Sequence, residues 1–339
     1  MELTTVWFAL IAILWMGYFA LEGFDFGVGM LLPVLGKSER ERRVLINTIG
    51  PVWDGNEVWL LVAGGATFAA FPEWYATLFS GFYMPLLLIL LALIVRGVAF
   101  EYRHKRNDLT WSRRWDAAII VGSVVPALLW GVAFANILRG VPIDADLEYV
   151  GGFFNLLNPY ALLGGAMTLL LFLTHGAMFI ALKTDGPIRH RARGLAVRIG
   201  LAAAVVTVAF LVWTQAETGS GASAVAFGVA ALALVGGLLS VQAGREGWGF
   251  LGTFVAIALG VAGLFLALFP DVMPTSLLDG TSLTTTNAAA TSYTLKIMTW
   301  TAAIFTPLVL AYQGWTYWVF RKRISVHHIP EAELAAARD

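Results

Sequence analysis

The sequence predicts an all-α polytopic membrane protein with nine transmembrane helices. Hydrophobic residues make up 58% of its 339 residues and charged residues only 13%, whereas soluble domains carry roughly 25% charged residues. The mean hydropathy is +0.75, and the apolar residues occur in runs of about 20, the length that crosses the hydrocarbon core of a bilayer. No single soluble core could bury this much apolar surface.

Helices are expected because lipid cannot satisfy an exposed backbone and because the apolar runs lack the alternation of barrel strands. The predicted spans are 6–34, 52–72, 75–100, 117–138, 158–182, 196–214, 222–243, 247–269 and 294–320.

The order of the spans predicts a simple organisation. The opening MELTTVWFAL lacks the basic region of a cleavable signal peptide, so the first span is read as a retained helix. The second and third spans are joined only by FPEW, which predicts antiparallel neighbours. The loops at about 139–157 and 270–293 are too short for a soluble domain. A single integral domain over 1–339 is therefore expected, with two four-helix bundles and one peripheral helix.

Lys and Arg predict the orientation. The connections at 35–50, 101–116, 183–198 and 244–246, together with the tail from Arg321, hold 19 of the 22 basic residues. Because positive loops face the cytoplasm, the N-terminus is expected outside and the C-terminus in the cytoplasm.

Several chemistries are excluded or unsupported by the sequence. The absence of cysteine excludes disulfides, thiolate metal sites and cysteine nucleophiles. No phosphate-binding glycine loop, zinc-protease motif or hydrolase triad is present, and no nucleic-acid partner is expected.

A small set of ionisable residues lies inside or at the ends of the first three spans, where such residues are costly and are functional candidates. They are Glu22, Asp25, Asp54, Glu57, Arg96 and Glu101. The predicted orientation places all six at a similar depth near the cytoplasmic face. Like charges and burial both disfavour ionised carboxyls, so some of these groups are expected to hold protons near neutral pH. Such a cluster is typical of a proton relay, and a cation site could also use it.

A structural interpretation stands beside the functional one. Glu101 and Glu22 can pair or extend to the headgroups, whereas the short Asp25 and Asp54 side chains reach less far. Arg96 is expected to pair with one of the acids. His175, the one histidine well inside a span, is expected to form a hydrogen bond across a helix interface rather than to bind a metal.

At these positions the sequence resembles subunit II of the cytochrome bd-type quinol oxidases. The similarity runs along almost the whole chain and includes GFDFGVGML (23–31), GPVWDGNEVW (50–59), SGFYMPLLLILLALIVRGVAFEYR (80–103) and LKIMTWTAAIFTPLVLAYQGWTYW (295–318).

This resemblance implies a subunit of a bacterial inner-membrane complex that oxidises quinol and reduces dioxygen to water. It implies a heterodimer with subunit I, which would carry heme b and heme d, while this chain would ligate no heme. Small single-helix accessory subunits, membrane lipid and quinone are further implied partners. The resemblance assigns a cytoplasmic proton-entry path to Asp54 and Glu101, with Asp25 and Arg96 as supporting neighbours. Glu57 is less strictly required, because some members carry Gln there.

Two other functions are compatible with the residues alone. An ion-coupled secondary transporter could use the carboxylates as its coupling site, with GFDFG and NPYALLGG as helix interruptions. A purely structural scaffold is compatible if the acids only form pairs. Heme absorption bands together with a co-purifying second subunit would favour the oxidase.

Overall fold

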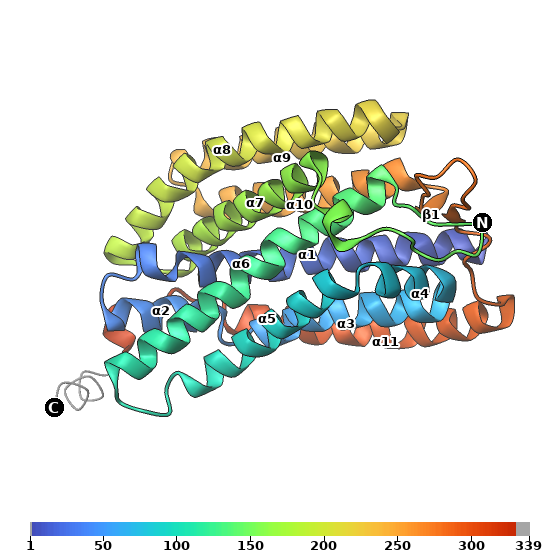
Figure 1. Cartoon of the computed structure of the whole chain (residues 1–339). Coiled ribbons are helices and arrows are strands. Elements are labelled where there is room, and N and C mark those ends of the chain that lie inside the picture. Colours follow the sequence, from blue (N-terminus) through green and yellow to red (C-terminus); the bar gives the residue numbers. More distant parts are fainter. Residues whose placement is uncertain (1, 330–339) are drawn as a thin grey trace.

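Helices dominate residues 2–329, which are the residues described in this computed structural model (Figure 1). The α-helices are α1 (Leu3–Leu35), α2 (Glu39–Ile49), α3 (Trp53–Ala70), α4 (Pro72–Gly81), α5 (Tyr83–Tyr102), α6 (Leu109–Arg139), α7 (Pro159–Lys183), α8 (Gly186–Thr218), α9 (Gly221–Gln242), α10 (Glu246–Leu268) and α11 (Ser292–Val319). The smaller elements are the strands β1 (Asp271–Met273) and β2 (Leu283–Thr284) and the 3₁₀ turns η1 (Phe153–Leu156) and η2 (Val326–His328).

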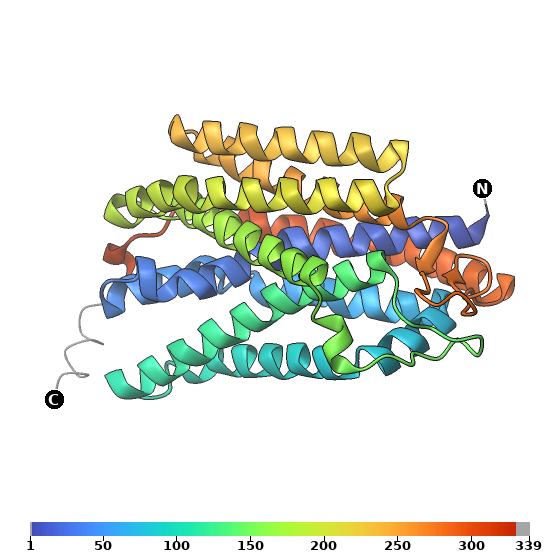
Figure 2. The same ribbon diagram turned by 45° about the horizontal axis from the view of Figure 1, so that its top comes forward.

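Helix α1 is the central element and packs against α3, α6, α7 and α10. Its approach to α7 depends on two facing glycines. A Cβ on Gly27 would lie 2.0 Å from the carbonyl oxygen of Phe172, and a Cβ on Gly176 would lie 2.5 Å from the Gly27 backbone. Small residues let two membrane helices approach this closely. Helices α8 and α9 lie side by side on the flank beyond α7 and α10 (Figure 2).

Eight of the described helices, α1 and α5 to α11, are long and apolar enough to cross a membrane. This agrees with an all-α polytopic membrane protein. Helix α3 covers the predicted second span but is not among these eight helices, and its first turns contain the polar residues of WDGNEVW. The count of nine crossings therefore stays a prediction.

The prediction of one continuous helix over 75–100 is wrong. The structure divides this stretch into α4 and α5, with a break at Phe82. Pro85 lies in the first turn of α5 and has no backbone N–H, so it cannot bond the Gly81 carbonyl and continue the helix.

Helices α3 and α5, which were expected to be antiparallel neighbours, meet near one end. The rings of Trp53 and Phe100 lie 4.9 Å apart there. Further along, the two helices separate around an apolar cleft of about 510 Å³, which α3, α4, α5 and α6 line together with Trp15. The main neighbour of α5 is α6.

The connection at 35–50 contains a helix that the sequence analysis did not predict, α2. Ser38 caps it by accepting a hydrogen bond from the Glu41 backbone N–H at 3.3 Å. Its buried face is apolar and follows helical spacing through Val44, Leu45 and Ile49. The signal was present, because a Ser before charged residues and an apolar stripe is a helix start, but the basic charge of the segment indicated a loop.

Helix α11 lies along the outside of the bundle, against α1 and α3 (Figure 1). Leu295 is its one buried residue. Large apolar side chains cover its outer surface, including Trp300, Leu308 and Trp315, which are exposed by 73%, 62% and 59%. A helix this apolar and this exposed needs lipid or a partner to cover it.

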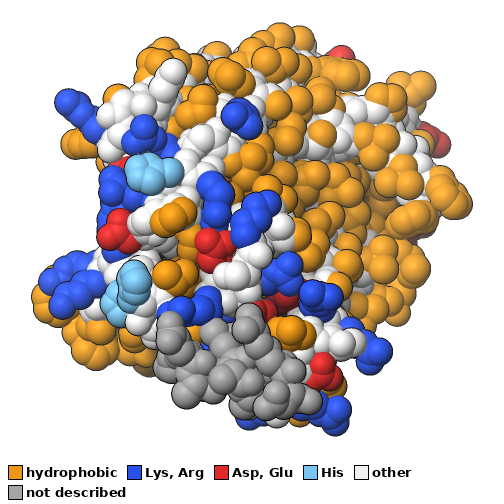
Figure 3. Space-filling model, turned by 90° about the vertical axis from the view of Figure 1, so that its left-hand side faces the viewer, with side chains coloured by type: hydrophobic (Ala, Val, Ile, Leu, Met, Phe, Trp, Pro, Cys, Tyr) orange, Lys and Arg blue, Asp and Glu red, His pale blue; other side chains and the backbone are white. Residues whose placement is uncertain are grey.

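The two ends of the bundle differ in charge. The end that contains α2 and η2 presents many Lys and Arg side chains, while the adjoining flank is apolar (Figure 3). At the other end, β1 pairs with β2 and the loop after α6 joins them through the bridge between Val141 and Thr275. This asymmetry follows the charge pattern of the sequence.

Candidate functional site

Arg96 is the centre of a buried polar site between α1, α3 and α5. Its side chain has no exposed surface. Nη1 donates to Glu22 Oε1 on α1 and, at 3.1 Å, to Glu57 Oε1 on α3. The guanidinium also lies over the rings of Phe26 and Phe100, at 4.8 and 5.2 Å from their centroids. Two acids from different helices therefore hold one cation, which confirms the expectation that Arg96 pairs with an acid.

Asp25 is the second fully buried acid of the site. Its Oδ2 accepts a hydrogen bond of 2.6 Å from Asn56 Nδ2, and Asn56 is also fully buried. Glu22 and Asp25 are three residues apart on α1, so they project from one side of the helix. The close approach of α1 and α7 at Gly27 keeps this part of α1 deep inside the bundle.

The site has an excess of negative charge. The three carboxyls of Glu22, Asp25 and Glu57 lie around one guanidinium, so full ionisation would leave two negative charges uncompensated. Four buried polar atoms, Glu22 Oε2, Asp25 Oδ1, Arg96 Nε and Arg96 Nη2, have no hydrogen-bond partner among residues 2–329. Buried polar groups of this kind bind ordered water, commonly with about three hydrogen bonds per water. The arrangement can therefore exchange protons between carboxyls.

The structure brings together only some of the predicted site residues. Asp25, Glu57 and Arg96 meet in the buried site, and Glu22 joins them. Asp54 and Glu101 are exposed in this chain, and neither forms a hydrogen bond or ion pair with the other described residues. Asp54 lies one turn before Glu57 on α3, and Glu101 lies at the last turn of α5. Asp54 is therefore close to Glu57, whereas Glu101 lies beyond Arg96 toward the basic end of α5.

Sequence reasoning missed the neutral polar residues that complete the site. Asn56 Oδ1 accepts hydrogen bonds from Tyr317 Oη at 2.7 Å and from Gln313 Nε2 at 3.4 Å, both on α11. Gln313 and Tyr317 are four residues apart and share one face of the helix. Two polar groups at that spacing in an apolar span were the available signal, but neither carries a charge that would mark it in a hydropathy profile.

A second ionic cluster joins α2, α5 and α6 at the basic end. Arg103, 1% exposed, donates to Asp116 Oδ1 at 2.6 Å and to both Glu39 oxygens at 2.7 and 3.0 Å. Arg42 adds a bond of 3.0 Å to Asp116. Burial acts to lower the pKa of the Arg103 guanidinium, but its bonds to Asp116 and Glu39 raise that pKa above its usual value. This cluster is fully paired and serves to hold the three helices together.

His175 also has a structural role, because its ring nitrogens form hydrogen bonds that join helices. Its Nε2 lies 3.0 Å from the Ala20 carbonyl, which can only accept, so Nε2 carries the proton and Nδ1 accepts from Thr253 Oγ1 at 2.7 Å. The ring stacks on Phe250 at 4.5 Å. Both nitrogens are engaged, so this side chain does not fit an iron ligand. It ties α1, α7 and α10 together, as the hydrogen-bonding interpretation predicted.

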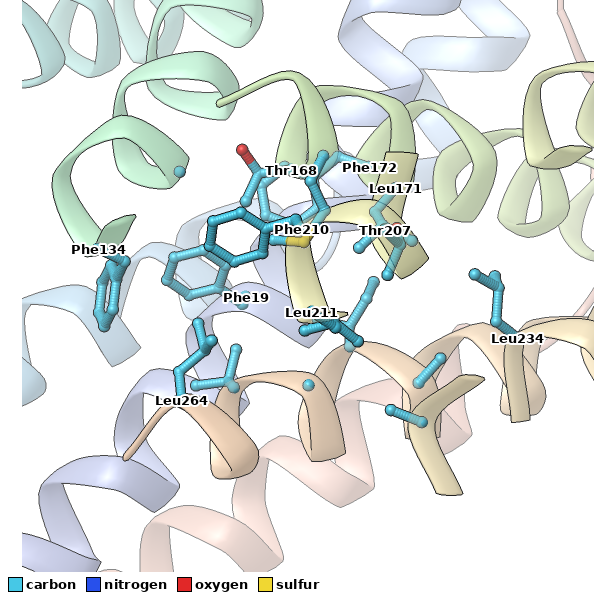
Figure 4. Close-up of a pocket in the computed structure, with 17 residues that line it drawn as sticks. Phe19, Phe134, Thr168, Leu171, Phe172, Thr207, Phe210, Leu211, Leu234 and Leu264 are labelled. Carbon is cyan, nitrogen blue, oxygen red and sulfur yellow. The ribbon is translucent and has the colours of Figure 1, made fainter. Parts of the chain in front are cut away.

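A cavity of about 40 Å³ lies deeper in the bundle, among α1 and α6 to α10 (Figure 4). Its wall is apolar, with Phe19, Phe134 and Phe210 among the lining residues, and its polar side chains are the two hydroxyls of Thr168 and Thr207. No ionisable side chain lines it.

The family model and the similar proteins indicate one and the same family. The profile of "Cytochrome bd terminal oxidase subunit II" matches residues 3–320. The chain is 44% identical to "Cytochrome bd ubiquinol oxidase subunit 2" of Bacillus subtilis (strain 168), over 96% of this chain and 97% of that protein. It is 38% identical to "Cytochrome bd-I ubiquinol oxidase subunit 2" of Escherichia coli (strain K12), over 96% of each.

The fold is also seen among solved structures. One of them is titled "The structure of bd oxidase from Geobacillus thermodenitrificans" and superposes with a TM-score of 0.76. The match covers 94% of this chain and 99% of that one at 14% identity. At this identity the likeness concerns the arrangement of helices alone.

Proposed function

Because this chain belongs to the family of cytochrome bd terminal oxidase subunit II, we propose that its buried acid site carries protons from the cytoplasm toward the hemes of the complex. The chain is a subunit of a membrane quinol:oxygen oxidoreductase of the bacterial inner membrane. Reduction of dioxygen to water consumes protons, and these must cross a layer of low dielectric. The transporter alternative is not favoured, because the relatives are oxidase subunits.

The observation that carries the proposal is the charge excess around Arg96 combined with unpartnered buried polar atoms. A fixed structural ion pair would have matched charges and satisfied atoms, as the Arg103 cluster has. Three carboxyls around one cation can instead share protons. The direct test is the rate of quinol-driven oxygen consumption after single acids are neutralised without a change of shape.

The entrance of the proposed path is the exposed edge of the site. Asp54 lies at the first turn of α3, and Glu57 follows one turn further in, where it contacts Arg96. Glu101 lies at the same end of α5. We assign the first proton-accepting role to Asp54, with Glu101 next along the path, and the inner roles to Glu57, Arg96 and Asp25.

The basic end of the bundle supports the proposed orientation. Nine crossings by α1, α3 and α5 to α11, within one integral domain, would place the N-terminus outside and the basic end in the cytoplasm. The Lys and Arg side chains in Figure 3 support this assignment, and the exposed edge of the acid site lies toward the same end.

Orientation can be measured with reporter fusions. A reporter joined after Arg323 is expected to read cytoplasmic, because positive segments are retained inside. A reporter inserted in the 275–290 loop is expected to read external. The reverse pair of signals would place the acid site on the wrong side of the membrane for proton uptake from the cytoplasm.

The proposed partner is subunit I, which would carry heme b, heme d and the quinol site. The proposed contact surface on this chain is α11. The exposed apolar side chains of α11 support this, together with its single buried residue. Small single-helix accessory subunits are further candidates for the remaining apolar flank. A heme-bearing subunit is expected to co-purify with this chain, whereas a colourless single chain would contradict the assignment.

The His175 side chain is not suited to bind iron, which leads to a further prediction. His175→Ala is expected to leave every heme absorption band of the purified complex in place, because both ring nitrogens serve helix packing. The loss of two buried hydrogen bonds should lower thermal stability, at about 1 kcal/mol for each bond. Loss of one specific heme band from an assembled complex would instead identify His175 as a ligand.

The apolar cleft of about 510 Å³ supports the binding of a lipid or a quinone. Pockets of roughly 300–1,000 Å³ hold ligands of moderate size. The residues that line the cleft are mostly apolar, with Leu60, Leu86 and Leu90 among them, so an apolar chain is the matching chemistry.

Occupancy of the cleft can be tested by filling it. Gly64 lines the cleft and has open space around its Cα, so Gly64→Leu is expected to exclude the ligand without distorting α3. Mass spectrometry of the purified complexes should then show less lipid or quinone bound to the variant than to the wild type. Gly228→Leu, on α9 and also in open space, is the matched control. Equal ligand content in all three proteins would contradict the assignment of the cleft as a binding site for lipid or quinone.

A further inference from the structure

A series of hydrogen bonds runs from Trp59 on α3 to Gln313 on α11, back to Asn56 on α3, and on to Asp25 on α1. Trp59 Nε1 donates to Gln313 Oε1 at 2.9 Å. Gln313 Nε2 donates to Asn56 Oδ1 at 3.4 Å, and Asn56 Nδ2 donates to Asp25 Oδ2 at 2.6 Å. Two amides therefore separate an indole from a buried carboxyl.

The first member of this hydrogen-bond series, Trp59, determines which group donates and which accepts at each step. An indole N–H can only donate, so the Gln313 oxygen must face Trp59, and the Gln313 amide nitrogen must face Asn56. That nitrogen is also only a donor, so the Asn56 oxygen must face it, which leaves the Asn56 nitrogen toward Asp25. The Leu21 carbonyl, 3.5 Å from Asn56 Nδ2, can only accept and agrees with this direction.

We propose that Trp59 is a positioning residue for proton uptake: acting through Gln313 and Asn56, it keeps an N–H donor on Asp25 Oδ2, so that a proton bound by Asp25 resides on Oδ1. Oδ1 is the oxygen of Asp25 that accepts no hydrogen bond from the described residues. A proton on Oδ2 would instead face the Asn56 amide hydrogens. The inference rests on the proposed role of Asp25 in proton transfer.

The position of Trp59 is built into the neighbouring helix. A Cβ on Gly17 of α1 would lie 2.1 Å from Cε3 of the Trp59 ring, so only glycine at this position leaves space for the indole. Gln313 and Tyr317 also give α11, which buries only Leu295, a polar attachment to the bundle. The charged and titratable groups that act on Asp25 are Glu22, Glu57, Arg96 and Tyr317, and none of them is altered by a change at Trp59.

The test is infrared difference spectroscopy of the purified two-subunit complex between two pH values. A protonated Asp25 gives a C=O stretching band that is absent in Asp25→Asn. With the proton on Oδ1, the C=O oxygen is Oδ2 and accepts the Asn56 hydrogen bond, which lowers the stretching frequency. Asn56→Leu removes that donor and is expected to move the band to higher frequency.

Trp59→Phe is expected to move the Asp25 band in the same direction as Asn56→Leu, by part of that shift, because Gln313 then loses its fixed orientation. Gly17→Ala, which displaces the indole, should act like Trp59→Phe. In a Gln313→Met background, adding Trp59→Phe should produce no further shift, because Trp59 acts only through Gln313. Trp248→Phe, an exposed tryptophan on α10, is the matched control and should leave the band at the wild-type position.

The outcomes separate this inference from the function on which it rests. An Asp25-dependent band that stays at its wild-type frequency in Trp59→Phe overturns the positioning role of Trp59 and leaves the proton role of Asp25 intact. If no Asp25-dependent band appears at any pH, Asp25 takes up no proton, and both assignments fail. A further shift when Trp59→Phe is added to Gln313→Met overturns the proposed chain through Gln313.

Discussion

Asp54→Asn is expected to reduce quinol-driven oxygen consumption by about 100-fold, the lower range of what one positioned proton-transferring side chain contributes. Asparagine keeps the size and hydrogen-bonding capacity of the side chain but cannot bind and release a proton. Asp54 forms no hydrogen bond or ion pair within residues 2–329 and is exposed, so the substitution breaks no polar bond among these residues. Heme content and subunit assembly are therefore expected to remain at wild-type levels.

Glu57→Gln is the matched comparison for Asp54→Asn. Both changes remove one carboxyl from the first two turns of α3. Gln at position 57 can still accept a hydrogen bond from Arg96 at the place where Glu57 now does, so a smaller loss of oxygen consumption is expected. An assembled Asp54→Asn complex with full heme content that respires at the normal rate across pH would refute the proton path and leave WDGNEVW as a structural helix start.

Arg96→Met is expected to prevent stable assembly of the complex. Methionine matches the length of the arginine stem but leaves Glu22, Asp25 and Glu57 without their cation in a buried place. Removing one partner of a buried ion pair typically costs about 3–5 kcal/mol, which is a large part of the stability of a typical protein. The measurements are the amount of assembled complex in the membrane and its thermal denaturation midpoint.

The cause of this loss can be separated from a simple packing defect. Adding Glu22→Gln to Arg96→Met removes a buried negative charge that has lost its partner. Glu22 is fully buried and is directly paired with Arg96 in the wild type. Assembly is expected to recover in part in the double variant. If the double variant is as unstable as Arg96→Met alone, the shape of the arginine between Phe26 and Phe100 matters more than its charge.

The candidate site was predictable in its charges and not in its contacts. A charged residue inside an apolar run stands out in a sequence, so Glu22, Asp25, Glu57 and Arg96 could be found by hydropathy. Asn56, Gln313 and Tyr317 could not be found in this way, because neutral polar residues are common in membrane helices. Their role depends on which helix faces α3. Sequence order gives no information about that, since α11 is more than 220 residues away from Asn56.

The sequence by itself determined the membrane-embedded helical class, the approximate spans and the uneven distribution of Lys and Arg, because hydropathy and charge are local properties that each residue carries along the chain. Only the tertiary structure decided that the 75–100 span breaks at Phe82, that α3 and α5 separate around a cleft, and that Asp54 and Glu101 lie outside the buried acids. These features depend on how helices pack. That packing is set by close contacts such as Gly27 against Gly176 and by the pairing of Arg96 with Glu22. Such contacts join residues far apart in the chain, so no local pattern records them.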